Sequence, residues 1–170
     1  MIYVLDASAL IFDSLLASSA FSYTTEEVIE EISKGELART KIEVYLTQGK
    51  IRIMAPPKEY LSKVTSVTIN TADLSILSKA DLSIIALALY LKDLSDDEII
   101  LVSDDYAVQN VAVTLGIKFK SLTVKGIVKK INWMIYCPAC GKTFKETARS
   151  ICPICGHHLK RKPKQKTPLR

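Results

Sequence analysis

The sequence predicts an α/β fold with a mainly parallel sheet of about five strands, followed by a small second unit. Two observations lead to this prediction. Through the first 122 residues, short apolar runs alternate with segments of helical periodicity, which is typical of strand–helix–strand units. Beyond that point the composition becomes strongly basic, and all four cysteines appear there. Right-handed crossovers between the strands would place helices on both faces of the sheet, giving three layers.

The predicted strands are short apolar runs bounded by polar or turn-forming residues. They cover residues 2–5, 21–24, 51–54, 99–102 and 117–122. The second run leads directly into a segment, residues 26–32, in which Val28, Ile29 and Ile32 follow helical spacing. A proline-led helix is expected to begin near residue 56, and the Ser/Thr-rich stretch 67–78 is compatible with either loop or short helix.

Two further helices are predicted in the second half of the first domain. Residues 83–91 are strongly apolar, and Asp81 lies in the first turn, where a carboxylate suits the helix dipole. Apolar residues recur at helical spacing between 106 and 115, and Gly116 follows as a C-cap.

Charge is distributed unevenly along the chain. Residues 1–120 hold 11 Lys+Arg against 17 Asp+Glu, a balance of −6, whereas residues 121–170 hold 12 against 1, a balance of +11. An acidic body joined to a basic end points to a polyanionic partner, although a basic tail can also serve solubility alone. The composition predicts a first domain, a linker, a cysteine unit and a disordered basic tail, over residues 1–122, 123–132, 133–159 and 160–170 respectively.

Targeting signals are not evident in the sequence. No basic region precedes the first apolar run, unlike in a signal peptide. The longest apolar run, within residues 84–91, falls well short of the roughly 18 residues that span a membrane. We therefore expect a soluble cytoplasmic protein.

The four cysteines form two C-x2-C pairs, each followed by glycine. They are Cys137, Cys140, Cys152 and Cys155, with Gly141 and Gly156 after the pairs. Four thiolates converging on one point suit a structural zinc ion, which supplies folding energy that so short a segment cannot obtain from a core. Two disulfides would require an oxidising compartment, and a redox C-x2-C would not be duplicated in this way. The pattern predicts a zinc ribbon with one structural Zn²⁺.

Acidic residues recur where the predicted strands end or the helices begin. They are Asp6, Glu27, Glu31, Asp81, Asp104 and Asp105. Each has an ordinary explanation as a helix cap or a solvated helix face. Together, carboxylates converging on one edge of a parallel sheet would repel one another unless cations bind between them. Hard oxygen ligands suit Mg²⁺ or Mn²⁺, and a pair of such ions can hydrolyse a phosphodiester. A phosphorelay receiver is excluded because the third strand run ends in MAPP, without an acid.

Four stretches resemble the acidic motifs of PIN-domain nucleases, in the same order: VLDASALI, YTTEEVIEEI, LSKADLSIIALAL and LVSDDYAVQNVA. With the CPxCG ribbon and basic tail, the chain resembles the archaeal members of the Nob family. These endonucleases mature the 3′ end of small-subunit ribosomal RNA. The resemblance implies a PIN-like three-layer α/β/α domain and Mn²⁺- or Mg²⁺-dependent hydrolysis of single-stranded precursor rRNA.

The resemblance also implies the site residues. Asp6 and Asp81 match the first and third motifs directly. Glu31, with Glu27 as a substitute, matches the second, and Asp105, with Asp104 in reach, matches the fourth. The implied partners are the small ribosomal subunit and an RNA-binding assembly factor, with no membrane and no small-molecule substrate. A toxin-type PIN ribonuclease and a non-catalytic RNA-binding protein remain as alternatives.

Overall fold

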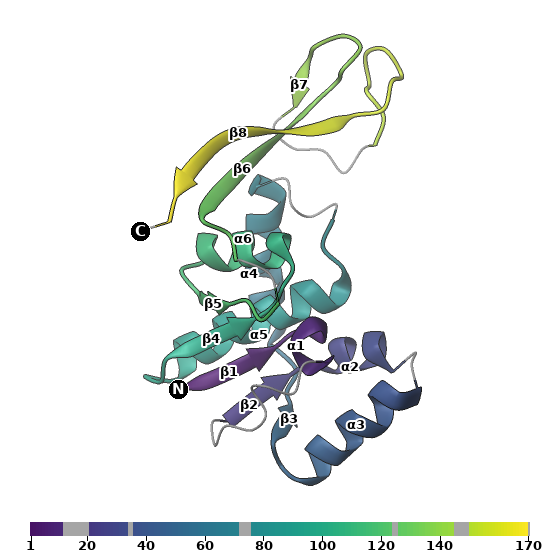
Figure 1. The fold of residues 1–170 in the computed structure, drawn as a ribbon. Helices are drawn as coiled ribbons and strands as arrows, with labels where there is room; N and C mark the ends of the chain where they lie inside the picture. Colours follow the sequence, from purple (N-terminus) through teal and green to yellow (C-terminus); the bar gives the residue numbers. More distant parts are fainter. Residues whose placement is uncertain (12–20, 34–35, 72–75, 124–125, 145–149, 170) are drawn as a thin grey trace.

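Five parallel strands form the sheet of the first domain (Figure 1). The computed structural model describes residues 1–11, 21–33, 36–71, 76–123, 126–144 and 150–169. The strands lie in the spatial order β3-β2-β1-β4-β5, so the chain reverses its direction of growth across the sheet after β3. The strands are β1 (Ile2–Leu5), β2 (Phe21–Thr24), β3 (Ile51–Ile53), β4 (Ile99–Val102) and β5 (Lys118–Lys120). All five predicted strands are confirmed, although β3 is one residue shorter than its apolar run and β5 covers only half of its run.

Both faces of the central strands are covered. Consecutive residues of a strand point to opposite faces, yet Val4 and Leu5 on β1 are both fully buried, and so are Leu101 and Val102 on β4. The edge strands β3 and β5 are more exposed. This burial pattern confirms the three-layer arrangement, with helices packed against both sides of an apolar sheet.

Six helices surround the sheet in the described residues. They are α1 (Ala7–Ile11), α2 (Glu26–Ile32), α3 (Glu36–Thr47), α4 (Lys58–Thr71), α5 (Lys79–Leu94) and α6 (Tyr106–Thr114). The sequence pattern did not predict α3, and it indicated α1 only through the possible helix cap at Asp6. The sequence left the stretch 67–78 as either loop or short helix. Its first residues, up to Thr71, belong to α4, and residues 72–75 lie outside the described residues. Gly116 follows α6 with a φ of 66°, as the predicted cap requires. None of the helices described is both long and apolar enough to cross a membrane.

The second unit is an antiparallel ribbon that extends away from the sheet domain (Figure 1). Its strands are β6 (Lys129–Tyr136), β7 (Thr143–Phe144) and β8 (Lys160–Pro168), in the order β7-β6-β8. We call β6 and β8 the stem and the whole unit the ribbon. The stem ends near the helices α4 and α6 of the first domain, and the cysteines lie at the opposite end.

The stem differs from the composition-based prediction. Residues 160–168 were expected to be disordered, but they pair with β6 along its length, and β6 itself begins inside the predicted linker 123–132. Two cationic side chains of β8 pack on aromatic rings of β6. The Arg161 guanidinium lies 4.7 Å from the Trp133 ring centre, and Lys162 Nζ lies 4.7 Å from the Tyr136 ring centre. Aliphatic stems over aromatic rings, together with the backbone ladder, order a segment that its charge alone would leave disordered.

Candidate active site and cysteine cluster

Asp6 is the first residue after β1 and is only 5% exposed. Its backbone N–H donates to the carbonyl of Val102 at 3.1 Å, which continues the pairing of β1 with β4 by one residue. Its carbonyl accepts hydrogen bonds from Ala9 and Leu10 at the start of α1. Asp6 therefore occupies the N-cap position of α1, and its side chain accepts the N–H of Ala7, the first residue of that helix, which agrees with the simpler interpretation of the sequence.

The Asp6 carboxylate is held from two sides. Its Oδ1 accepts the N–H of Ala7 at 2.6 Å, and its Oδ2 accepts the hydroxyl of Ser103 at 2.6 Å. Ser103 is itself buried and accepts the N–H of Asp105 at 3.1 Å. Ser103 thus connects the ends of two neighbouring parallel strands and fixes the orientation of the Asp6 side chain.

Two further carboxylates act on Asp6 electrostatically. Burial raises the pKa of Asp6 most, the hydrogen bonds from Ser103 and Ala7 lower it, and the charges of Asp81 and Asp105 raise it again, giving about 6. Burial also raises the pKa of Asp81, and the charge of Asp105 adds to this effect. Asp6, Asp81 and Asp105 therefore form one mutually repelling group at the carboxyl edge of the sheet. We call these three residues the acidic cluster.

Asp81 and Asp105 also cap helices. Asp81 forms a capping box with Ser78: its Oδ2 accepts the Ser78 N–H at 2.7 Å, and its own N–H donates to Ser78 Oγ at 3.1 Å. Asp105 is the N-cap of α6, and its Oδ1 accepts the N–H of Ala107 at 2.6 Å. These bonds hold the two carboxylates at the N-termini of α5 and α6, where the helix dipoles favour negative charge.

Asp104 is directed elsewhere. Its Oδ1 accepts the hydroxyl of Ser121 at 2.6 Å and the N–H of Leu122 at 2.7 Å, and Thr123 donates to its Oδ2 through the hydroxyl and the backbone N–H. Desolvation would raise the pKa of Asp104, but these hydrogen bonds outweigh it and lower the pKa to about 2. Of the adjacent pair, Asp105 belongs to the acidic cluster, and Asp104 anchors the loop after β5.

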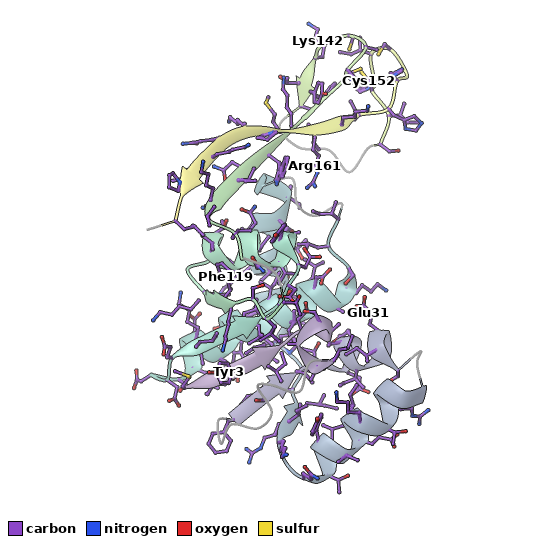
Figure 2. The ribbon with its side chains drawn as sticks, in the orientation of Figure 1. Tyr3, Glu31, Phe119, Lys142, Cys152 and Arg161 are labelled. Carbon is purple, nitrogen blue, oxygen red and sulfur yellow. The ribbon has the colours of Figure 1, made fainter. Side chains whose placement is uncertain are left out.

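The two glutamates of α2 also differ. Glu27 accepts the hydroxyl of buried Ser83 on α5 at 2.7 Å. Desolvation tends to raise the pKa of Glu27, but hydrogen bonding, first from Ser83, gives a net lowering. Glu31 lies one helical turn further along the same face and is exposed. Figure 2 labels Glu31 on α2, the helix that packs against α1 and α5.

The acidic cluster is not a closed chelate. Among the described residues, the four cysteines are the only group of three or more Cys, His, Asp or Glu side chains placed closely enough to hold a metal ion as they stand. The carboxylates of the acidic cluster nevertheless suit divalent cations: all are hard oxygen ligands, and the one that is buried carries a charge that its acidic neighbours destabilise. A bound cation would relieve that repulsion.

The cysteine cluster is built from two similar turns at the far end of the ribbon, where Figure 2 labels Cys152. In the first turn, the N–H of Cys137 donates to the carbonyl of Lys142 at 2.8 Å, and the N–H of Gly141 donates back to the carbonyl of Cys137 at 2.9 Å. The second turn repeats both bonds between Cys152, His157 and Gly156 at the same distances. Both glycines have a φ of 71°, a conformation that other residues rarely adopt.

The geometry of the cysteine cluster fits a tetrahedral ion. The Sγ atoms of Cys137 and Cys155 lie 3.4 Å apart, and those of Cys140 and Cys152 lie 3.7 Å apart. A zinc ion with Zn–S bonds of about 2.3 Å requires sulfur atoms about 3.8 Å apart, whereas a disulfide requires about 2.05 Å. None of the four cysteines forms a disulfide bond. The N–H of Cys140 lowers the pKa of Cys137 to about 7, which favours the thiolate that a metal needs.

Sequence reasoning missed two buried amides of α6. Gln109 donates from Nε2 to the carbonyl of Ser103 at 2.8 Å and accepts the N–H of Ile127 at 2.9 Å. Asn110 exchanges two hydrogen bonds of 2.8 Å with the backbone of Ile131. These side chains join the end of β4 to the stem of the ribbon. The available signal was a pair of adjacent amides inside an otherwise apolar helix.

The fold and the acidic edge together define a nuclease domain of the PIN class. A family model described as the PIN domain of ribonuclease matches residues 3–91, a range that contains Asp6, Glu27, Glu31 and Asp81. The chain is 41% identical over 144 residues to "Endoribonuclease Nob1" of Pyrococcus abyssi, covering 84% of each protein. It is 39% identical over 161 residues to "Ribonuclease VapC1" of Thermoplasma acidophilum, covering 95% of this chain and 78% of that protein.

A eukaryotic relative matches over a shorter region. The "20S-pre-rRNA D-site endonuclease NOB1" of Saccharomyces cerevisiae is 33% identical over 87 residues, 49% of this chain and 19% of that protein. The two archaeal alignments are longer than the 120 residues that end with β5, so the likeness continues into the ribbon. The chain belongs to the Nob1 family of PIN-domain endoribonucleases.

Proposed function

We propose that this endoribonuclease cleaves single-stranded precursor rRNA at the 3′ end of the small-subunit rRNA, using Mn²⁺ or Mg²⁺. The single observation that carries the proposal is the acidic cluster: a buried carboxylate, Asp6, at the carboxyl edge of a PIN sheet, on which the charges of Asp81 and Asp105 both act. The substrate class rests on the Nob1 relatives, of which the yeast protein is named for its action on pre-rRNA.

The proposed division of labour follows the contacts. Asp6, Asp81 and Asp105 hold the cations, and exposed Glu31 adds a fourth carboxylate on the strength of its motif. Ser103 fixes the orientation of the Asp6 carboxylate, and Asp104 anchors the loop after β5. When bound, the cations would activate a water molecule and stabilise the leaving oxygen of the phosphodiester. The cysteine cluster would hold one structural Zn²⁺, which requires the reduced thiols expected in the cytoplasm.

The test uses the full chain and an RNA spanning the 3′ end of small-subunit rRNA with its downstream extension. With Mn²⁺ present we expect one dominant cut, and the D6N variant should cut at least about a hundredfold more slowly, because a ligand charge is lost. A matched control is D93N, which also alters a carboxylate that accepts a hydroxyl, that of Tyr60, near the opposite end of α5 from Asp81. That variant should cut at the wild-type rate.

Two outcomes would count against the proposal. Undiminished cleavage by D6N would leave Asp6 as a helix cap only. Degradation of many unrelated single-stranded RNAs at comparable rates would favour a toxin-type ribonuclease. A partner protein or the pre-ribosome belongs in the assay as a second arm, because the Nob family acts within ribosome assembly.

A further inference from the structure

A hollow lies between the PIN domain and the stem of the ribbon, directly beside the acidic cluster. It is a cavity of about 430 Å³. Asp105 and Tyr106 line it from the start of α6, and Lys129, Ile131, Trp133 and Arg161 line it from the stem. A second hollow of about 420 Å³ shares Tyr106, Ile127, Lys129 and Ile131 and extends to Lys166 on β8. Because they share four residues, the two hollows form one groove, which we call the stem groove.

The alternation of β6 explains why these side chains meet. Lys129, Ile131 and Trp133 are two residues apart along the strand, so they project to the same face. Residues opposite each other in a ladder share a face, and Arg161 pairs with Ile135, Lys166 with Ile131. Figure 2 shows Arg161 on the side of the stem that faces the PIN domain.

The same alternation sends a second, similar pair to the other face. Tyr136 and Lys162 form a cation–π pair at the same 4.7 Å as Trp133 and Arg161, but they belong to the alternate set of residues on both strands. The stem therefore carries an aromatic–cation pair on each face, and only one of them lines the groove. The chain thus provides its own control.

The groove is held in place by the α6 amides. Asn110 is buried and bonds both backbone groups of Ile131, and Gln109 bonds the N–H of Ile127 at the floor of the groove. These contacts fix the stem against α6. The wall that carries Trp133 therefore has a defined position relative to Asp105.

The chemistry of the lining indicates a nucleotide. An indole, a phenol that is 56% exposed and a planar guanidinium are surfaces on which an unstacked base can lie. Lys129 and Lys166 are placed to meet phosphates. At its other end the groove reaches Asp105, one residue before Tyr106. We propose that the stem groove binds an unstacked base of the single-stranded RNA substrate, so that the adjoining phosphodiester lies at the acidic cluster.

This proposal rests on the proposed function and gives the ribbon a second role. The stem would form one wall of the substrate-binding site, in addition to any contact that the cysteine end makes with RNA. An apolar peptide is the rival occupant of such a hollow. The cations on the groove and the balance of +11 in residues 121–170 favour a polyanion instead.

The first experiment uses Trp133 as its own reporter, because it is the only tryptophan in the chain. The full protein is titrated with a single-stranded uridine oligomer of about six nucleotides, without added Mn²⁺ or Mg²⁺, and tryptophan fluorescence is followed. Stacking should quench the emission saturably. An abasic oligomer with the same phosphates should need at least about tenfold higher concentration for the same quenching, since it lacks the stacking surface. Equal quenching by both would show that only phosphates are bound and would overturn the proposal.

The second experiment compares the two faces of the stem. W133A should weaken binding of a fluorescently labelled uridine oligomer about tenfold at constant salt, with an unchanged salt dependence, and W133F should retain most of the affinity. Y136A, on the opposite face, should change the affinity less than about twofold. Equal losses in W133A and Y136A would overturn the proposal.

A charge-matched pair sharpens this comparison. R161Q and K162Q each remove one positive charge, and the two residues are neighbours in the chain. If net charge alone attracted the RNA, both variants would lose the same affinity for the uridine oligomer. Binding in the stem groove predicts a clearly larger loss of affinity for R161Q. If W133A binds normally while D6N fails to cleave, the groove proposal fails and the proposed function stands. If the uridine oligomer quenches Trp133 but no rRNA fragment is cut in Mn²⁺, the groove proposal stands and the proposed function fails.

Discussion

The acidic cluster of the PIN domain and the cysteine cluster of the ribbon are both candidate metal sites, yet they are assembled differently. Cys137 and Cys155 lie 18 residues apart in the chain, and two local turns with nearly identical hydrogen bonds aim the four sulfur atoms at one point. Asp6 and Ser103, by contrast, lie 97 residues apart and meet only because β1 and β4 are neighbours in the sheet.

The difference teaches how much each site depends on its ion. The sulfur atoms are already within 4.8 Å of one another, but little apolar core lies beneath them, so a bound ion would supply most of the folding energy. The carboxylates rest on a large core that places them without help. The cost is that burial, with a smaller contribution from the neighbouring charges, raises the pKa of Asp6 to about 6. The first site should lose its fold without metal, and the second should lose only its activity.

The largest expected effect is at the cysteine cluster. Cys152→Ser should abolish stoichiometric zinc binding and unfold the outer end of the ribbon, because an ion of this kind contributes on the order of 10 kcal/mol to such a site. The PIN domain should keep its melting transition. Zinc is measured by atomic absorption and the two units by amide NMR spectra.

Ile154→Ser is the matched control for this substitution. Ile154 lies in the same turn and is largely exposed, so its replacement removes no ligand and little buried surface. It should retain one zinc per chain. Retention of zinc by Cys152→Ser would contradict the four-cysteine site, and loss of the PIN transition would show that the two units do not fold separately.

The adjacent residues Asp104 and Asp105 test the acidic side of the comparison. Asp105→Asn should keep the cap of α6, since Asn and Asp are equivalent there, and should slow RNA cleavage about a hundredfold through loss of a ligand charge. Asp104→Asn should do the opposite. It should cost about 1 kcal/mol in the free energy of unfolding by weakening the bonds to Ser121–Thr123, with cleavage changed only slightly.

The pH dependence of stability separates the same two residues. The pKa of Asp104 is lowered to about 2, so its stabilisation is complete above its ordinary value of 3.8 and disappears as the pH falls toward 2. Wild type and Asp104→Asn should therefore differ in melting temperature at neutral pH and converge in acid. If Asp104→Asn abolished cleavage at unchanged stability, the assignment of the two residues would be reversed.

The smallest expected effect is a stabilisation. The pKa of Asp6 is raised from 3.8 to about 6, so the folded protein holds a proton that the unfolded chain releases. Stability should therefore fall as the pH rises from about 4 to about 6 and stay lower above that. Without divalent metal at pH 7.5, Asp6→Asn should melt a few degrees higher than wild type, a shift typical of about 1 kcal/mol.

Two comparisons check the cause of that stabilisation. The advantage of Asp6→Asn should vanish near pH 4, where both side chains are neutral in the folded protein. Added Mn²⁺ should raise the melting temperature of wild type and leave that of the variant nearly unchanged. Identical pH profiles for the two proteins would mean that neither burial nor the neighbouring charges raise the pKa of Asp6 in the folded protein.

Much of the fold was readable from the sequence because it depends on local patterns. Apolar runs predicted all five strands of the parallel sheet, helical spacing predicted α2, α5 and α6, and duplicated C-x2-C pairs predicted the cysteine cluster. Composition misled only where side chains from distant segments pack: Lys160–Pro168 became a strand because Arg161 and Lys162 found aromatic partners on β6.

By itself, the sequence determined which residues carry chemistry: four thiols in a local motif, and acids at the ends of predicted elements. Tertiary structure decided which of those acids act on one another. The spacing in Ser103-Asp104-Asp105 cannot tell which carboxylate turns toward Asp6 and which toward the loop after β5, because that depends on the neighbours each side chain meets across the sheet. For the same reason, only the packing of the stem against α6 brought Trp133 within one cavity of Asp105.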